Sequence, residues 1–198
     1  MAGEEVARGA EAIITRIDGV IDKHRPEKAY RHPELDRQLR KQRTRKEAKI
    51  LKDLESLRVP APRIISADDK EGHIRMTGLE GPKLRDALED NLALCERVGK
   101  HVATLHDHDI IHGDLTTSNM IVQEGGEVAL IDFGLTTHST RTEDRAVDLH
   151  LFKQALESKH HEAAEKAWES FLQGYHPKDR DSVLRRLTIV EQRGRNKA

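Results

Sequence analysis

The sequence has almost no cysteine and no long apolar run, and each absence limits what the protein can be. Cys95 is the only cysteine, which excludes an internal disulfide and favours a reducing compartment. No apolar run approaches the roughly 20 residues that a transmembrane helix needs. The first residues, Met-Ala-Gly-Glu-Glu, lack a signal-peptide pattern. We therefore expect a cytoplasmic protein with no membrane contact.

Apolar residues are also few, at 36% of the chain against 35% for charged residues. They are concentrated in periodic stretches, which argues against wholesale disorder. The formal net charge is -1, from 34 basic and 35 acidic residues, so the overall charge indicates no particular partner. A length of 198 residues suits one domain or two small lobes.

The first third of the chain is predicted to be rich in strands. β-branched residues recur between residues 4 and 25, and Asp18-Gly19 is a hairpin-turn signal among them. A long helix is predicted to begin at His32-Pro33-Glu34 and to end at Val59-Pro60. Its partial apolar stripe consists of Leu35, Leu39, Ile50, Leu54 and Leu57. The strands predicted after this helix span residues 63–67 and 73–77.

Beyond Gly81-Pro82 the pattern becomes mostly helical. Apolar residues recur at helical spacing from Leu94 to Leu105 and predict a core-facing helix. A short strand pair is predicted on either side of Gly125-Gly126, at residues 120–122 and 128–131, and the last third is helical again. The sequence therefore predicts an α+β fold of two lobes, a strand-rich one at residues 1–77 and a mostly helical one at residues 78–198.

The strongest chemical signal is a pair of loops in the second lobe. The first loop reads His112-Gly113-Asp114-Leu115-Thr116-Thr117-Ser118-Asn119, and the second reads Asp132-Phe133-Gly134. Phosphoryl transfer needs positioning and charge rather than covalent help from the protein. Asp114 can take or orient the proton of the attacking hydroxyl, and Asn119 and Asp132 offer the hard oxygen ligands that Mg²⁺ prefers. This pattern is typical of the catalytic and metal loops of protein kinases.

Those motifs predict a minimal protein-kinase-like fold that uses ATP and Mg²⁺. The alternative is a pair of acidic turns beside a hairpin. Two motifs with fixed residues at set spacings, separated by a short hairpin, make that alternative the weaker interpretation.

A kinase site also needs a lysine on a strand and an acidic partner on the long helix. Lys23 ends the third predicted strand and is assigned to the phosphates, with Lys28 as the second choice. Glu47 is the sole acid in the basic middle of the helix and is assigned as the partner of Lys23. Otherwise Glu47 would be a solvated residue that pairs with basic neighbours one turn away.

The loop that should cover the phosphates is degenerate. It lies between the first two predicted strands and keeps only Gly9 of the three glycines in the kinase pattern. Small residues still let a backbone approach phosphates, although less freely than glycine does. The nucleotide contacts predicted here are Ala7, Gly9, Ala10, Glu11, Ala12 and Ile14.

Met76-Thr77-Gly78-Leu79 is predicted to join the two lobes and to bind adenine. The Thr77 carbonyl and the Leu79 amide are the predicted partners of the adenine edge, and Met76 is predicted to close the back of the pocket. The alternative is an ordinary strand end.

A histidine cluster allows a competing interpretation as a metal-dependent phosphohydrolase. The cluster consists of His101, His106, His108 and His112. Such a site needs further His or Asp ligands, and the spacing equally suits a polar helix end. We interpret His112 as the structural histidine of the catalytic loop.

Several segments together resemble one particular family. They are Gly9-Ala10-Glu11-Ala12, residues 30–36, residues 43–48, the two loops described above and Arg193-Gly194-Arg195. The chain resembles the small atypical kinase of the KEOPS complex, from residue 6 to residue 195. The resemblance implies a subunit that hydrolyses ATP and can phosphorylate Ser/Thr. It also implies association with the threonylcarbamoyl-transferase subunit that modifies adenosine beside the tRNA anticodon, and with a further small KEOPS subunit.

The resemblance further implies tRNA contact through the complex and through the basic C-terminal tail. Its cations are Arg185, Arg186, Arg193, Arg195 and Lys197. Thr116 stands where ordinary protein kinases have lysine, and residues 136–145 leave no room for a long activation segment. The family shares both features, which favour ATPase activity coupled to a partner over routine peptide phosphorylation.

Two rival functions stay open. A catalytically silent scaffold or RNA-binding module is disfavoured by the complete set of Lys23, Glu47, Asp114, Asn119 and Asp132. A small-molecule kinase of the aminoglycoside type is disfavoured by the family resemblance and by the basic segments.

Overall fold

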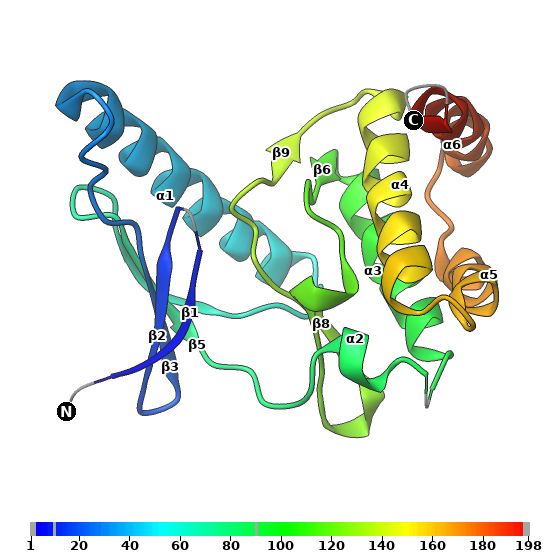
Figure 1. Cartoon of the computed structure of the whole chain (residues 1–198), viewed down its shortest axis with the longest axis horizontal. Coiled ribbons are helices and arrows are strands. Elements are labelled where there is room, and N and C mark those ends of the chain that lie inside the picture. Colours follow the sequence, from blue (N-terminus) through cyan, green and yellow to red (C-terminus); the bar gives the residue numbers. More distant parts are fainter. Residues whose placement is uncertain (1–2, 10, 90, 196–198) are drawn as a thin grey trace. The chain divides into compact units, whose positions relative to one another are not determined.

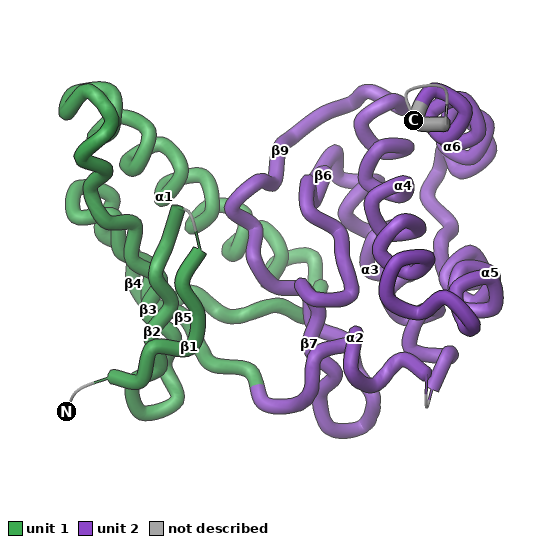
Figure 2. The backbone as a smooth tube through the Cα atoms, in the orientation of Figure 1, with its two compact units in different colours: residues 1–79 green, residues 80–198 purple. Residues whose placement is uncertain are grey.

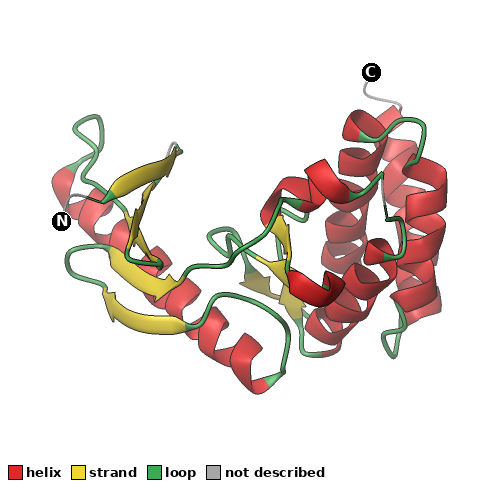
Figure 3. Ribbon diagram, turned by 90° about the horizontal axis from the view of Figure 1, so that it is seen from below, coloured by secondary structure: helices red, strands yellow, loops and turns green. Residues whose placement is uncertain are grey.

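The chain folds into two compact units, Met1–Leu79 and Glu80–Ala198, which Figure 2 shows in different colours. The structure is a computed structural model that describes residues 3–9, 11–89 and 91–195. The division follows Leu79, whereas the sequence placed it after residue 77. Unit 1 holds the larger sheet and one long helix, and unit 2 is mostly helical (Figure 3).

The sheet of unit 1 is antiparallel throughout, with strand order β1-β2-β3-β5-β4. Figure 1 labels β1, β2, β3 and β5 of this sheet. Its strands are β1 (Glu4–Arg8), β2 (Ile13–Ile17), β3 (Val20–His24), β4 (Ile64–Asp68) and β5 (His73–Thr77). Asp18 and Gly19 both have positive φ and close the β2–β3 hairpin at the predicted turn.

Helix α1 (Pro33–Ser56) begins at the predicted proline and ends three residues before Val59. Arg58, with φ of 56°, turns the chain out of the helix before the predicted Val59-Pro60 stop is reached. The C-terminal half of α1 buries Ile50 and Leu54 against the sheet, where Ile74 of β5 is also fully buried.

The N-terminal half of α1 departs from the predicted apolar stripe. Leu35 is 51% exposed. The polar residues that the helix buries between residues 36 and 47 are Asp36, Arg40, Thr44 and Glu47. Asp36, Arg40 and Glu47 are tolerated in the interior because each forms ion pairs, whereas the buried Thr44 hydroxyl has no partner among the described residues.

Unit 2 contains five α-helices, two short 3-10 helices and two short strand pairs within its described residues. The helices are α2 (Leu84–Ala87), α3 (Leu94–Asp107), α4 (Thr142–Lys159), α5 (Ala164–Gly174) and α6 (Arg180–Arg195). The strand pairs are β6 (Ile110–Ile111) with β9 (Thr137–His138), and β7 (Met120–Val122) with β8 (Val128–Leu130). Across the described residues of both units, no helix is both long enough and apolar enough to cross a membrane.

Helices α3 and α5 approach each other closely because each carries a glycine at the contact. A Cβ added at Gly99 would lie 2.2 Å from the Phe171 carbonyl oxygen, and one at Gly174 would lie 1.9 Å from the Glu96 carbonyl oxygen. Only residues without a Cβ fit there. This contact places Tyr175, the first residue after α5, in the core beside α3.

Candidate active site

The catalytic loop brings Asp114 and Asn119 together. The loop ends in a 3-10 turn at Thr117–Asn119. Asn119 Nδ2 donates hydrogen bonds to Asp114 Oδ2 at 2.7 Å and to the Asp114 carbonyl oxygen at 2.9 Å. An asparagine that donates through its nitrogen keeps its side-chain oxygen as an acceptor. That oxygen is the atom suited to a Mg²⁺ ion.

The second predicted metal ligand comes from an adjacent stretch of backbone. The Ile131 N–H donates to the Asn119 carbonyl oxygen at 3.0 Å, and Asp132 is the next residue. Asp132 has φ of 62°, and Gly134 N–H lies 3.4 Å from its Oδ1. Unit 2 therefore presents an amide oxygen and a carboxylate, two hard oxygen donors, from neighbouring loops.

The two loops also pack directly on each other. Gly113 has φ of 83°, and a Cβ there would lie 2.6 Å from the Leu135 carbonyl oxygen. Thr136 Oγ1 donates to the His112 carbonyl oxygen at 3.0 Å. The ring of Phe133 lies against the ring of His112, with centroids 5.1 Å apart. Movement of one loop therefore requires movement of the other.

Asp148 of α4 anchors the catalytic loop, a role that the sequence analysis did not assign. This fully buried carboxylate accepts the backbone N–H groups of His112 and Gly113, each at 2.8 Å. His106 Nε2 lies 3.3 Å from the carboxylate, and His106 Nδ1 lies 2.8 Å from the Tyr175 hydroxyl. Burial alone would raise the pKa of Asp148, but the His106 hydrogen bond and nearby donors outweigh it and hold that pKa below its ordinary value.

The four histidines of the competing interpretation bond to different groups. His101 Nε2 lies 2.7 Å from Glu127, and His108 Nδ1 lies 2.8 Å from the Thr104 carbonyl oxygen. His106 belongs to the Asp148 anchor, and burial lowers the pKa of His112. These four imidazoles are thus used singly as structural groups and do not share one set of ligands.

In unit 1, the structure brings Lys23 and Glu47 together. Lys23 Nζ donates to Glu47 Oε1 at 2.8 Å, and the two residues are 6% and 2% exposed. The alternative interpretation of Glu47 as a solvated helix residue is therefore wrong. Lys28 lies half-buried in the loop after β3. Arg25, which the sequence analysis overlooked, donates to the other carboxylate oxygen of Glu47.

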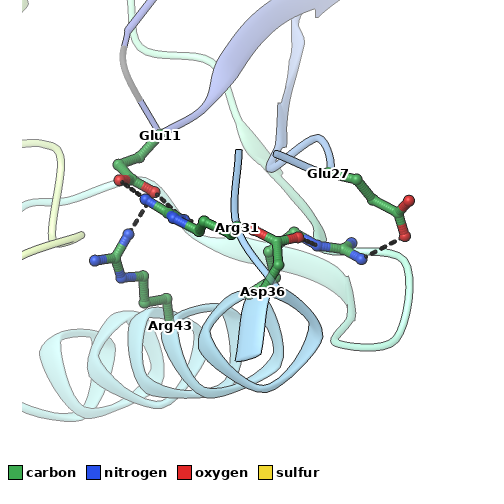
Figure 4. A network of polar contacts seen from close by, with 6 residues as sticks. Glu11, Glu27, Arg31, Asp36 and Arg43 are labelled. Atoms are coloured by element: carbon green, nitrogen blue, oxygen red, sulfur yellow. Dashed lines mark hydrogen bonds and ion pairs between the residues drawn. The ribbon is translucent and has the colours of Figure 1, made fainter. Parts of the chain in front are cut away.

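Ion pairs hold the loop between β1 and β2 to α1 and to the segment just before that helix (Figure 4). Arg31 Nη2 lies 2.6 Å from Glu11 Oε1, and Arg43 Nη1 lies 2.5 Å from Glu11 Oε2. The Arg31 hydrogen bond, with added help from the Arg43 charge, lowers the pKa of Glu11. The Glu11 side chain thus anchors the loop, and the contact of Glu11 with nucleotide stays a prediction. The network continues through Asp36 and ends at Glu27, which Figure 4 also labels.

Within the same loop, the Gly9 N–H donates to the Ala12 carbonyl oxygen at 2.9 Å and closes a tight turn. Ala7 and Ile14 face each other as a cross-strand pair. Ala10 lies outside the described residues. Ala7, Gly9, Ala12 and Ile14 therefore lie at one end of the β1–β2 hairpin, and their contact with nucleotide stays a prediction.

The segment predicted to bind adenine is fixed by its neighbours in unit 1. Met76 is buried. Thr77 exchanges two hydrogen bonds of 2.9 Å with the backbone of Arg63, one through its N–H and one through its hydroxyl. The Leu79 carbonyl oxygen accepts from Arg16 at 3.2 Å. The segment is ordered, and its contact with adenine stays a prediction.

The fold itself matches known kinases. The Rio2 kinase from Chaetomium thermophilum, solved as an ADP/Mg²⁺-phosphoaspartate complex, superimposes with a TM-score of 0.62 at 14% identity, over 97% of this chain and 70% of that one. WbdD in complex with a kinase inhibitor gives a TM-score of 0.56 at 18% identity, over 84% and 44% of the two chains. At such identities the likeness shows the fold alone. The predicted kinase-like α+β fold is confirmed.

Comparisons with known sequences identify the family to which this kinase-like chain belongs. A model of the RIO domain matches residues 15–147. The KEOPS complex subunit Bud32 of Pyrococcus abyssi is 42% identical, over 89% of this chain and 84% of its own length. The EKC/KEOPS complex subunit BUD32 of Encephalitozoon cuniculi is 43% identical, over 96% and 94%. The chain therefore belongs to the RIO domain family and, within it, to the Bud32 proteins.

Other relatives are longer than this chain. A probable bifunctional tRNA threonylcarbamoyladenosine biosynthesis protein of Methanocaldococcus jannaschii is 42% identical over 96% of this chain but only 36% of its own length. The match to a protein of the same name from Methanobrevibacter smithii also covers only 36% of that protein's length. The chain thus spans about a third of these relatives. The resemblance drawn from the sequence motifs is confirmed.

Proposed function

We propose that this chain is the ATP-dependent atypical Ser/Thr kinase and ATPase subunit of a KEOPS complex, active in the cytoplasm in support of threonylcarbamoyladenosine formation on tRNA. The chemical part rests on one observation about Asn119. Its side-chain Nδ2 donates to the Asp114 carboxylate at 2.7 Å, and its carbonyl oxygen accepts from the N–H of Ile131, the residue before Asp132. The names of the Bud32 relatives support the biological part.

In this proposal each site residue has one role. Asp114 orients the attacking hydroxyl or water and takes its proton. Asn119 and Asp132 hold Mg²⁺, which neutralises charge that develops on the phosphates. Lys23, aligned by Glu47, donates to the phosphates. Thr116 supplies no cation where ordinary kinases have lysine, which favours ATP hydrolysis over transfer to a peptide.

The proposed partners are the threonylcarbamoyl-transferase subunit, a further small KEOPS subunit and tRNA. Relatives named bifunctional carry this sequence as about a third of a longer chain. Their fusion supports a physical association between this kinase-like chain and another part of the same modification system.

Measurement of ATP turnover by the chain alone, with the transferase partner and with tRNA added, tests the proposal. We expect Mg²⁺-dependent turnover that rises when the partner is added. Asp132→Ala should raise the Mg²⁺ concentration needed for half-maximal turnover. The matched control is Asp181→Ala, an exposed acid on α6. Turnover that persists in chelator, or that is absent under all three conditions, contradicts the proposal.

The lysine assignment is tested separately. Lys23→Ala should lower turnover severely because it removes the ammonium paired with Glu47. Lys28→Ala should have a much smaller effect because Lys28 lies in the loop beyond β3. The reverse ranking would show that Lys28 is the phosphate ligand.

A further inference from the structure

Arg25 is buried immediately after β3 and directs its side chain at Glu47. Its N–H donates to the Gly72 carbonyl oxygen at 2.9 Å, which fixes its backbone, and only 3% of the residue is exposed. Its Nη2 donates to Glu47 Oε2. Among the described residues, no group accepts from its Nε or Nη1. Among the described residues, Glu47 is therefore the acceptor for the side-chain hydrogen bonding of this buried guanidinium.

Glu47 is consequently shared between two buried cations. Lys23 donates to Oε1, and Arg25 donates to Oε2. A buried carboxylate that loses its partner is strongly destabilising. If Lys23 were the only cation on Glu47, any shift of its ammonium toward a phosphate would leave that carboxylate uncompensated.

We propose that Arg25 is a positioning residue for nucleotide binding. It holds Glu47 in place and keeps it neutralised, so that Lys23 can redirect hydrogen bonding from Glu47 to a nucleotide phosphate. An arginine suits this task because its guanidinium stays charged and is a rigid planar donor. The inference rests on the proposed function, in which Lys23 binds the phosphates.

A purely structural role for Arg25 makes a different prediction. The Arg25–Glu47 pair would then stabilise unit 1 without affecting how strongly the folded protein binds nucleotide. The two roles are separated by a binding constant measured well below the unfolding temperature of each variant.

The experiment titrates MgADP and MgATP into the full chain by calorimetry and measures KM and kcat for ATP. We expect Arg25→Gln to raise Kd and KM by about tenfold, since one charge-assisted hydrogen bond is lost, with a smaller change in kcat. Arg25→Lys keeps a cation opposite Glu47 and should restore most of the affinity. Arg145→Gln is the control, because it removes an arginine that pairs with Asp109 and Asp179 in unit 2.

A double-mutant cycle tests whether Arg25 acts through Glu47. In a Glu47→Gln background there is no carboxylate to neutralise, so adding Arg25→Gln should change Kd by less than about twofold. This pair also keeps the test available if Arg25→Gln alone does not fold, because it leaves no buried unpaired carboxylate. A severalfold further loss in that background would overturn the inference.

The remaining outcomes separate this inference from the proposed function. If Arg25→Gln binds nucleotide as tightly as the wild type while Lys23→Met does not, Arg25 is a structural residue only and the proposed function stands. If the wild type binds no MgATP, or if Lys23→Met binds it unchanged, the proposed function itself fails. An equal loss of affinity in Arg145→Gln would show a general effect of lost ion pairs.

Discussion

At the scale of single residues, the Asp114 carboxylate is positioned by a neighbour that has its own proposed task. Asn119 uses its side-chain nitrogen on Asp114 and keeps its side-chain oxygen for a cation. The base and one metal ligand are thereby fixed relative to each other, which is the main contribution a protein makes to phosphoryl transfer.

Asp114→Ala is therefore expected to abolish ATP turnover and leave the fold intact. A general base and positioning group contributes roughly 10²–10⁴-fold in rate. Steady-state turnover and circular dichroism of the variant measure both halves of this expectation. Asp181→Ala, at the exposed start of α6, should match the wild type. Turnover within a fewfold of wild type would remove Asp114 from the role.

The lowered pKa of Asp148 predicts that the folded protein loses stability in acid. Its folded pKa lies below the ordinary value of 3.8, so the unfolded chain takes up the proton first as the pH falls. The stabilisation of the fold by the Asp148 carboxylate is therefore complete above pH 3.8, and it is lost as the pH falls from that value to the lower folded pKa. At neutral pH, Asp148→Asn should lower the free energy of unfolding by about 1.5–3 kcal/mol.

Denaturant unfolding of both proteins between pH 3 and pH 7 measures this difference. The gap between wild type and Asp148→Asn should be constant near neutral pH and shrink below about pH 4. Asp181→Asn, whose carboxylate is exposed, serves as the control. A gap that is unchanged down to the lowest pH would contradict the assignment of the low pKa to Asp148.

These residues differ in how far the sequence could predict them. Asp114 and Asn119 lie five positions apart in one loop, so their pairing follows from local spacing. The Lys23–Glu47 pair spans 24 positions and became visible only through the downstream motifs. Arg25 and Asp148 carry no motif, and their roles depend on tertiary burial. An acid between the buried Ala146 and Leu149 was the one signal that could have indicated Asp148.

At the scale of elements, helix α1 performs two different tasks along its length. Its C-terminal half buries leucine and isoleucine against the sheet, and this half followed the predicted apolar stripe. Between residues 36 and 47 the helix instead buries charged side chains: Arg40 pairs with Glu27, and Glu47 pairs with Lys23 and Arg25. The half-buried Arg43 of the same stretch pairs with Glu11. A periodic apolar pattern cannot reveal such a face, because long-range partners decide whether a charged residue is buried.

The α3–α5 contact is a second element-scale feature that sequence periodicity did not reveal. A Cβ at Gly174 would approach the Glu96 carbonyl oxygen to 1.9 Å, so the helices must separate to accept it. We expect Gly174→Ala to destabilise unit 2 by about 1–3 kcal/mol, as overpacking does. Gln173→Ala, on the exposed side of the same helix, should be nearly neutral. Thermal unfolding compares the two, and equal midpoints would show that the helices accommodate the methyl group.

At the scale of the whole molecule, the near-neutral net charge conceals a basic C-terminal segment. Helix α6 packs on α4 through Val183 and Leu187, and both Arg186 and Arg193 pair with Glu143. Arg193 is one of the cations predicted from the sequence to contact tRNA. In the structure its guanidinium already has a carboxylate partner, so contact with a phosphate would exchange one partner for another.

Truncation after Glu191 should weaken tRNA binding by the assembled complex in a salt-dependent way. The deletion removes Arg193, Arg195 and Lys197; the side chain of Arg195 and all of Lys197 lie outside what the structure describes. If Arg195 and Lys197 contact phosphate, log K against log salt should flatten by about 1.4–1.8, and by about 2–3 if Arg193 leaves Glu143 to join them. Glu143→Gln releases Arg193 together with Arg186 without shortening the chain, and it should steepen the slope by about 0.7–0.9 for each released arginine that then meets a phosphate. ATP hydrolysis by the isolated chain should change little in either variant, since neither removes a residue of the two loops. An unchanged affinity and slope after truncation would show that the tail is a solvated terminus, and the tRNA contact of this chain would have to lie elsewhere.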